Sequence, residues 1–297
     1  MKNNTIDAVL VTYNPDKDLL KSCINSLSFQ VRKIWIINNY SIDFNVEDEL
    51  FDDFNNIEVI SLGENKGIAY AQNHGIKKSL YCQAKFILLS DQDTIYPENF
   101  VQKILPAFVA KNNPVAAIAP LFHDAVGNKK NDGFILLSKF GYSIIFPDKG
   151  HYEINHAIAS GLILNSEYLF DIGLMNTDLF IDWVDFEWCW RAISKGYCII
   201  GNANVVIKHN LGDAQVHVAE KSMTVRSSLR HYYIVRNAFY LARHSPSLNF
   251  LHRLNLFYWG VCHVAAYSIL AKPRLENIKL TFLGFYHGVT RRLGRLD

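Results

Sequence analysis

The stretch FILLSDQDTIYPENF, residues 86–100, places two carboxylates directly after a short apolar run. Four large apolar residues, Phe86–Leu89, are typical of a strand buried on both faces of a sheet. Ligands of open α/β sheets bind at the carboxyl ends of strands, where Asp91 and Asp93 would lie. Two neighbouring carboxylates repel each other, so a cation between them is one explanation of the pair. A solvated turn or a helix cap is the alternative for an isolated pair of this kind.

Further apolar runs and helical patterns accompany this strand in the first ninety residues. Residues 7–13, 32–37 and 57–62 are predicted strands, and residues 17–29 and 67–82 are predicted helices. This alternation predicts an α/β fold with a mostly parallel sheet, in which right-handed crossovers bring the strand ends to one edge. The polar residues at these strand ends should then meet in one crevice. They are Asn14, Asn38, Asn39, Asp91 and Asp93.

Composition places the chain among ordinary globular proteins, with 49% apolar and 20% charged residues in 297. The five cysteines form no CxxC pair, which argues against a zinc ribbon and favours a reducing compartment. The first residues lack the apolar core and cleavage site of a signal peptide. We therefore expect a protein that faces the cytoplasm.

The C-terminal part differs from the rest in charge. Residues 226–297 hold eleven Lys and Arg against two acids, about +9, which leaves about −7 for residues 1–225. Residues 254–271 carry no formal charge, a length at the lower limit for a membrane span. We expect residues 216–297 to form a helical, basic and aromatic extension of a domain at 1–215. The extension would lie at an anionic membrane surface, cap the main domain or pair subunits.

Two further groups of residues suggest a site. Asn65 and Gly67 precede a predicted helix with several small residues, which would let a phosphate or a backbone approach its N-terminus; tight helix–sheet packing is the alternative. Asp182 and Asp185 lie among tryptophans, where desolvation would raise their proton affinity and suit a general base; a helix cap is the alternative for Asp185. Glu187 and Arg191, four residues apart, have the spacing of a structural salt bridge.

Three basic residues are also candidates. His209 follows a predicted strand at residues 198–208 and could be a third metal ligand or a phosphate contact, although a lone histidine is more often structural. Arg230 and Arg236 flank two tyrosines and could hold an anionic diphosphate. A basic helix face that meets solvent or lipid headgroups explains the same pattern.

Seven short motifs follow one another along the chain: VTYNP (11–15), NNYS (38–41), ENKGIAYAQNHG (64–75), SDQDT (90–94), ASG (159–161), DWVDFEWCWR (182–191) and HNLGD (209–213). They cover roughly residues 5–240, and their co-occurrence is more specific than any one of them. As a set they resemble family 2 glycosyltransferases, and most closely the bacterial rhamnosyltransferases of O-antigen or capsule synthesis.

The resemblance implies a GT-A fold, an inverting mechanism that depends on Mg²⁺ or Mn²⁺, and a nucleotide-sugar donor, dTDP-L-rhamnose first among them. It implies that Asp91 and Asp93 hold the ribose and the metal, and that Asp185 is the general base, with Asp182 as compensation for Val184 where the family has Glu. It implies nucleotide contacts from Thr12, Tyr13, Asn14, Asn38, Asn39, Asn65 and Gly67. Asn38 departs from the family's usual Asp, which changes the hydrogen bonds available to a pyrimidine.

The same resemblance implies a glycan acceptor, linked to polyprenyl diphosphate, at the inner face of the bacterial plasma membrane. We expect part of its pocket to come from residues 120–160, a region with little periodicity. Other donors, such as a UDP-hexose or a furanose, stay open. A sugar nucleotidyltransferase also stays open, although residues 11–18 lack the Gly-rich loop that it requires. So does a non-catalytic, membrane-associated scaffold that binds a nucleotide sugar. Nucleic-acid binding is disfavoured, because the basic segment is apolar and carries no known motif.

Overall fold

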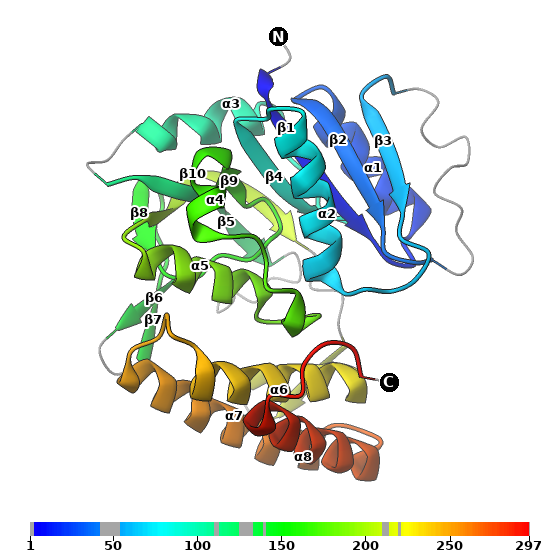
Figure 1. Ribbon diagram of the computed structural model, residues 1–297, viewed down its shortest axis with the longest axis vertical. Helices are drawn as coiled ribbons and strands as arrows, with labels where there is room; N and C mark the ends of the chain where they lie inside the picture. The colour runs from blue at the N-terminus through cyan, green and yellow to red at the C-terminus, as the bar shows by residue number, and fades with distance from the viewer. Residues whose placement is uncertain are drawn as a thin grey trace.

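The computed structural model places eight strands in one sheet with helices against its faces (Figure 1). The strand order is β3-β2-β1-β4-β9-β5-β10-β8. The sheet is mixed but mostly parallel, and the predicted fold class is confirmed. The structure describes residues 3–41, 54–109, 113–124, 133–138, 141–209, 214–218 and 221–296.

The first half of the sheet is parallel, as predicted from the alternation of strands and helices. Its strands are β1 (Asn3–Thr12), β2 (Val31–Asn38), β3 (Ile57–Ser61) and β4 (Phe86–Asp91), and its helices are α1 (Lys17–Ser28) and α2 (Ile68–Tyr81). Alternate residues of β1 face opposite layers: Val9 packs in the same cluster as α2, and Leu10 in the same cluster as α1. Residues on both faces of β1, β2 and β4 are buried, which explains the continuous apolar runs of these strands, whereas the edge strand β3 is only partly buried.

The second half of the sheet begins with β9 (Ile163–Asn165), a strand of three residues that lies antiparallel between β4 and β5 (Val115–Asp124). β5 pairs in parallel with β10 (Cys198–His209), and β8 (His151–Ile154) closes the edge in the antiparallel direction. Because β9 adjoins β4, the loop before β9 lies beside the strand that ends at Asp91. That loop contains Ala159 and Ser160.

Short elements complete this half of the chain. The helical ones are α3 (Phe100–Ile104), η2 (Leu105–Val109), η3 (Ser166–Tyr168), α4 (Leu169–Ile172), η4 (Thr177–Leu179) and α5 (Val184–Ser194). Two hairpins are formed by β6 (Phe134–Ser138) with β7 (Gly141–Ile145) and by β11 (Ala214–Val218) with β12 (Lys221–Val225).

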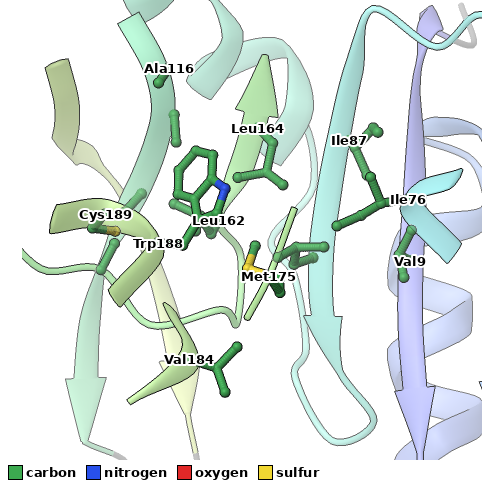
Figure 2. Close-up of a cluster of buried hydrophobic side chains, with 14 of the residues drawn as sticks. Val9, Ile76, Ile87, Ala116, Leu162, Leu164, Met175, Val184, Trp188 and Cys189 are labelled. Carbon is green, nitrogen blue, oxygen red and sulfur yellow. The ribbon is translucent and has the colours of Figure 1, made fainter. Parts of the chain in front are cut away.

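One buried cluster joins α2, the sheet and α5 (Figure 2). Trp188 is completely buried in this cluster, and its indole N–H donates to the carbonyl of Gly173 at 2.9 Å. Arg191 forms the expected ion pair with Glu187, with Nε 2.9 Å from Oε1. Its guanidinium also bonds the carbonyls of Ile172 and Leu174. These contacts fix α5, and therefore the position of Asp185 in its first turn.

Three helices follow the sheet: α6 (Ser228–His244), α7 (Phe250–Leu270) and α8 (Arg274–Thr290). They form a layer on one side of the sheet domain (Figure 1). Trp190 of α5 shares a buried cluster with Leu241 of α6 and Leu256 of α7. The layer therefore packs directly on the helix that carries Asp185. The division of the chain near residue 215 stays a prediction.

The predicted apolar segment lies within α7. Among the helices that the structure describes, none has the length and hydrophobicity that a bilayer crossing requires.

Candidate active site

A cavity of about 940 Å³ lies where the carboxyl ends of β1 and β4 meet the start of α5 and the C-terminal helices. Asp91, Asp93 and Asp185 all line it, together with Tyr13 and Asn39. The predicted crevice at the strand ends therefore exists. It also has a wall that the strand-end reasoning did not include, contributed by α6 and α7.

Asp91 is the last residue of β4 and lies opposite Val11 of β1. Its Oδ2 accepts a hydrogen bond of 2.7 Å from the Ser160 hydroxyl, whose oxygen lies 2.8 Å from the Thr94 hydroxyl. Ser160 and Thr94 are both fully buried. Since charge-assisted hydrogen bonds are short and strong, this pair of hydroxyls fixes the orientation of the Asp91 carboxylate at the cavity.

The main chain at the end of β1 is held by the residue between the two acids. The Gln92 side chain accepts from the Tyr13 N–H at 2.8 Å, and its amide nitrogen lies 3.4 Å from the Tyr13 carbonyl oxygen. Tyr13 is half exposed and lines the cavity. The DQD stretch therefore supplies two carboxylates to the cavity and uses its central amide to position the neighbouring strand end.

Asp185 lies in the first turn of α5 and is partly accessible from the cavity. Its carboxylate accepts from the Ala159 N–H at 3.1 Å and from the Phe186 N–H at 2.9 Å. Burial raises the pKa of Asp185 to about 7, and the nearby negative charge of Asp91 acts in the same direction. A carboxylate with this pKa can accept a proton near neutral pH, which is the property of a general base.

Asp182 also lines the cavity, but it is held in ion pairs. Its Oδ1 lies 2.9 Å from Nη1 of Arg226, and its Oδ2 lies 3.3 Å from Nε of Arg230. Both arginines line the same cavity. These contacts give Asp182 the role of positioning two guanidinium groups at the wall. The predicted catalytic role of Asp182 stays a prediction.

The chain before α5 is conformationally strained, with φ of +63° at Phe180, +62° at Asp182 and +67° at Trp183. Such values cost free energy for residues with a Cβ and persist only where the surroundings impose them. The buried Asn237 amide nitrogen donates to the carbonyls of Leu179, Ile181 and Asp182, at 2.8–3.0 Å. Asn237 therefore holds the strained segment that leads into Asp185.

The residues predicted to contact a nucleotide divide into two groups, and the first lines the cavity. Asn39 donates to Oδ1 of Asn65 at 3.0 Å and accepts from the Lys66 N–H at 2.9 Å. Gly67 has φ of +86°, and a Cβ at this position would lie 2.5 Å from the carbonyl oxygen of Phe180. Only glycine permits this close approach, which brings the N-terminus of α2 to the strained segment.

The second group does not line the cavity, although Asn14 is exposed to solvent. Thr12 is fully buried in the sheet. Asn38 accepts from the Ser41 hydroxyl at 2.9 Å, and that hydroxyl accepts from the Asn14 N–H at 3.1 Å. None of these three predicted residues is among those that line the cavity. The Ser41 hydroxyl bridges the main chain of Asn14 and the side chain of Asn38. A nucleotide contact from these residues stays a prediction.

Arg236 requires a correction. It is fully buried, and its guanidinium donates to the Leu179 carbonyl at 2.8 Å and to the Asn237 side chain at 2.9 Å. It also bonds the carbonyls of Asp178 and Gly294. Arg236 therefore holds main-chain carbonyls together and does not reach a diphosphate in the cavity. Arg230, by contrast, lines the cavity.

Of the three predicted metal ligands, the structure describes the side chains of Asp91 and Asp93 but not that of His209. Within the described part of the chain, no group of three or more His, Cys, Asp or Glu side chains is arranged to hold a metal ion. His209 ends β10, and its side chain lies outside the described residues. Asp91 and Asp93 supply hard oxygen ligands at the cavity, which fits a cation whose remaining ligands are phosphate oxygens and water.

Sequence reasoning missed several residues of the site. Ser160 and Gln92 lie within two of the family motifs, ASG and SDQDT, but the motifs alone do not indicate their hydrogen bonds to Asp91 and Tyr13. Trp259, His263 and Tyr267 of α7 line the cavity as well. In the sequence these three rings are spaced four residues apart. A buried helix or a helix at a membrane would show the same spacing, so the pattern does not identify a cavity wall. Ile158 and Ala159 are the lining residues that fall in the expected 120–160 region.

Comparison with known proteins identifies the family of the chain. The family model "Glycosyl transferase family 2" matches residues 7–168. The dTDP-rhamnosyl transferase RfbF of Shigella flexneri is 30% identical over 296 residues, which cover 97% of this chain and 96% of the relative. The low-salt glycan biosynthesis hexosyltransferase Agl10 of Haloferax volcanii is 22% identical over 305 residues, covering 98% and 92%.

Solved structures show the same fold at low identity. S. aureus TarS 1–349 has a TM-score of 0.59 and 15% identity, and the match covers 98% of this chain and 82% of that one. GalNAc-T7, solved with UDP, GalNAc and Mn²⁺, has a TM-score of 0.59 and 13% identity. The match covers 89% of this chain and 57% of the GalNAc-T7 chain. On the family match and the shared GT-A-like fold, the chain is a glycosyltransferase and belongs to glycosyl transferase family 2.

Proposed function

We propose that the protein transfers L-rhamnose from dTDP-L-rhamnose to a hydroxyl of a glycan acceptor, with inversion at the anomeric carbon. The observation that carries the proposal is the position of Asp185, whose pKa is raised to about 7, on the cavity that Asp91 and Asp93 also line. The choice of donor rests on the 30% identity with the Shigella flexneri dTDP-rhamnosyl transferase.

The donor would occupy the side of the cavity formed by the first half of the sheet. Tyr13, Asn39, Asn65 and Gly67 would contact the nucleotide there. Asp91 and Asp93 would hold Mg²⁺ or Mn²⁺, as their oxygen ligands and their position at the cavity allow. A cation bound there would neutralise the charge of the diphosphate leaving group.

Asp185 supplies the proton transfer. Its carboxylate accepts the proton of an acceptor hydroxyl, whose oxygen forms a bond to the anomeric carbon of rhamnose. The bond between that carbon and the diphosphate oxygen breaks, and dTDP leaves with the electron pair. Because attack comes from the face opposite the nucleotide, the anomeric configuration inverts. The hydrogen bonds from Ala159 and Phe186 hold the carboxylate in place for this step.

The acceptor would be a glycan on polyprenyl diphosphate, at the inner face of a bacterial plasma membrane, in the synthesis of O-antigen or capsule. Apolar side chains at helical spacing on α8 are exposed to solvent: Leu275, Ile278, Phe282 and Phe285. Lys272, Arg274 and Lys279 lie on or beside the same helix. An exposed apolar stripe with basic neighbours fits the surface of an anionic bilayer, with the enzyme bound peripherally.

The experiment is a donor panel offered to the purified protein with Mg²⁺ or Mn²⁺. Binding is measured as the shift in Tm, and turnover as the release of the nucleoside diphosphate. We expect dTDP-L-rhamnose to give the largest shift and EDTA to abolish turnover. A larger response to a UDP-hexose or a furanose donor would change the donor and keep the enzyme class. Binding of every donor without turnover, with a lipid-linked acceptor mimic present, would instead identify a scaffold.

A further inference from the structure

We propose that a row of aromatic rings on α7, formed by Trp259, His263 and Tyr267, is the subsite that binds the sugar ring of the acceptor. The inference rests on the proposed transfer reaction and names where its second substrate docks. The three residues lie four apart, so they share one face of the helix. All three line the cavity that also contains Asp185.

The rings form a continuous row. The centroids of Trp259 and His263 lie 4.8 Å apart with an interplanar angle of 35°, and those of His263 and Tyr267 lie 4.2 Å apart at 30°. Trp183 packs edge-to-face on Trp259, with centroids 5.0 Å apart at 84°. Trp183 lies two residues before Asp185. The row therefore begins next to the base and extends along α7.

The second layer of contacts holds this row in place. The ring nitrogens of His231 and His263 lie 3.1 Å apart, and the rings of His231 and Tyr267 have centroids 4.2 Å apart. The indole N–H of Trp183 donates to the carbonyl of Ile234 at 3.1 Å. Since His231 and Ile234 both belong to α6, the row is positioned by two packed helices and is already ordered before a ligand enters.

The chemistry of the row fits a neutral sugar ring. One face of a pyranose presents C–H groups, which pack against the electron-rich face of an aromatic ring, while its hydroxyls need polar partners. Burial, with the neighbouring His231 and Arg226, lowers the pKa of His263 to about 3, so its ring is uncharged at neutral pH. Arg226 and Arg230, paired with Asp182 on the same cavity, offer donors to hydroxyls at the edge.

The position of the row favours the acceptor over the donor. The predicted nucleotide residues, such as Asn39, Asn65 and Gly67, come from the first half of the sheet, whereas the row comes from the C-terminal helices. An inverting transfer needs the acceptor on the face of the donor sugar that is opposite the nucleotide. The row contacts Trp183, which lies two residues before the base Asp185, so an acceptor bound on the row would lie next to the base. The other side of α7 carries exposed apolar residues, among them Leu254 and Ile269.

The test uses the full chain and three substitutions on α7. Trp259→Leu keeps an apolar side chain and removes the aromatic face, and Trp259→Phe restores a ring. Tyr258→Ala is the matched control, because Tyr258 is the adjacent aromatic residue, is 70% exposed and does not line the cavity. The acceptor probes are octyl glycosides of common hexoses and N-acetylhexosamines, with dTDP-L-rhamnose as donor. Initial rates give KM separately for donor and acceptor.

We expect Trp259→Leu to raise KM for the accepted glycoside by roughly tenfold and Trp259→Phe to restore most of the affinity, as for the loss of an aromatic contact. Donor KM, slow hydrolysis of the donor by water and Tm should stay at wild-type values. Tyr258→Ala should match the wild type throughout.

An unchanged acceptor KM in Trp259→Leu would overturn the inference, and so would parallel losses of donor affinity and donor hydrolysis in that variant. A fall in Tm shared by Trp259→Leu and Trp259→Phe, with acceptor KM rising equally in both, would also overturn it by assigning Trp259 to packing alone. Failure of the proposed function has a different signature, since the wild type would then neither bind nor hydrolyse dTDP-L-rhamnose.

Discussion

Asp91 and Asp185 are held by two consecutive residues of one loop. The Ser160 hydroxyl donates to Asp91 at 2.7 Å, and the Ala159 N–H donates to Asp185 at 3.1 Å. The two acids are far apart in the sequence and lie on different elements, so this loop links the predicted metal side of the cavity to the predicted base. It also keeps the two negative charges close enough that Asp91 raises the pKa of Asp185.

The first prediction concerns the pH dependence of the rate. Asp185 must be ionised to accept a proton, and its pKa is about 7. With saturating substrates, kcat should therefore rise by about tenfold per pH unit well below pH 7 and level off above it. The measurement is kcat from pH 5 to 9. A flat profile across pH 6–8 would contradict the assignment of Asp185.

The same group affects stability in the opposite sense. The folded-state pKa of about 7 lies above the ordinary value of 3.8, so the folded protein binds this proton more tightly than the unfolded chain. The stabilisation is complete below about pH 4 and is lost as the pH rises through 7. Asp185→Asn should therefore raise Tm relative to the wild type at pH 8 and lose most of that advantage at pH 4. An equal difference at both pH values would contradict the shift.

Ser160→Ala tests the link between the loop and Asp91. The substitution removes the hydroxyl that donates to the Asp91 carboxylate and leaves the buried Thr94 hydroxyl without that partner. We expect a cost of about 1–3 kcal/mol in unfolding free energy and a similar loss in donor affinity. Ser194→Ala is the control, since its exposed hydroxyl bonds only a helix carbonyl. Donor KM equal in both variants would contradict a role for Ser160 at the site.

Gly67 and Gly63 form a matched pair that tests whether the close contact between Gly67 and Phe180 matters. Both have positive φ, +86° and +76°, so alanine is strained at either position. A Cβ at Gly67 would meet the Phe180 carbonyl, whereas a Cβ at Gly63 meets nothing within 4 Å. We expect Gly63→Ala to cost about 1 kcal/mol, and Gly67→Ala distinctly more together with a loss of kcat. Chemical denaturation and kinetics measure both. Equal effects would show that the contact with Phe180 is unimportant.

The exposed stripe on α8 can be tested with vesicles. Leu275 is 84% exposed and Phe282 is 60% exposed, so Leu275→Asp with Phe282→Asp should leave the fold intact. We expect this double variant to lose most of its co-sedimentation with anionic vesicles, because it adds negative charge and removes apolar contact. Phe170→Asp, a fully exposed residue of α4, is the control. Equal binding by all three proteins would place the membrane contact elsewhere.

Much of the first half of the fold could be predicted from the sequence. The predicted strand at residues 32–37 is β2 at Val31–Asn38, and the predicted helix at residues 67–82 is α2 at Ile68–Tyr81. These segments are readable because buried parallel strands are apolar without interruption and the helices between them have their own period. By contrast, β9 has three residues and pairs only with strands distant in sequence, so no local pattern marks its antiparallel direction.

The sequence predicted those site residues whose positions follow from the strand order alone. Parallel strands bring Asn39 and Asp91 to one edge, and the structure places both on the cavity. Local hydrogen bonds could not be predicted from the sequence. The Ser41 hydroxyl donates to the Asn38 side chain, and the Arg236 guanidinium donates to main-chain carbonyls. The wall from α7 was also beyond local reasoning, since Trp183 meets Trp259 across 76 residues of sequence.

The most direct test of the account is the transfer rate of Asp185→Asn beside its donor affinity, with Glu167→Gln, an exposed acid, as the control. The account predicts that transfer from dTDP-L-rhamnose falls by at least about 100-fold, since the amide cannot take the proton, while donor affinity stays close to that of the wild type. Glu167→Gln should behave as the wild type. An Asp185→Asn enzyme that transfers sugar within a few-fold of the wild-type rate would contradict the account.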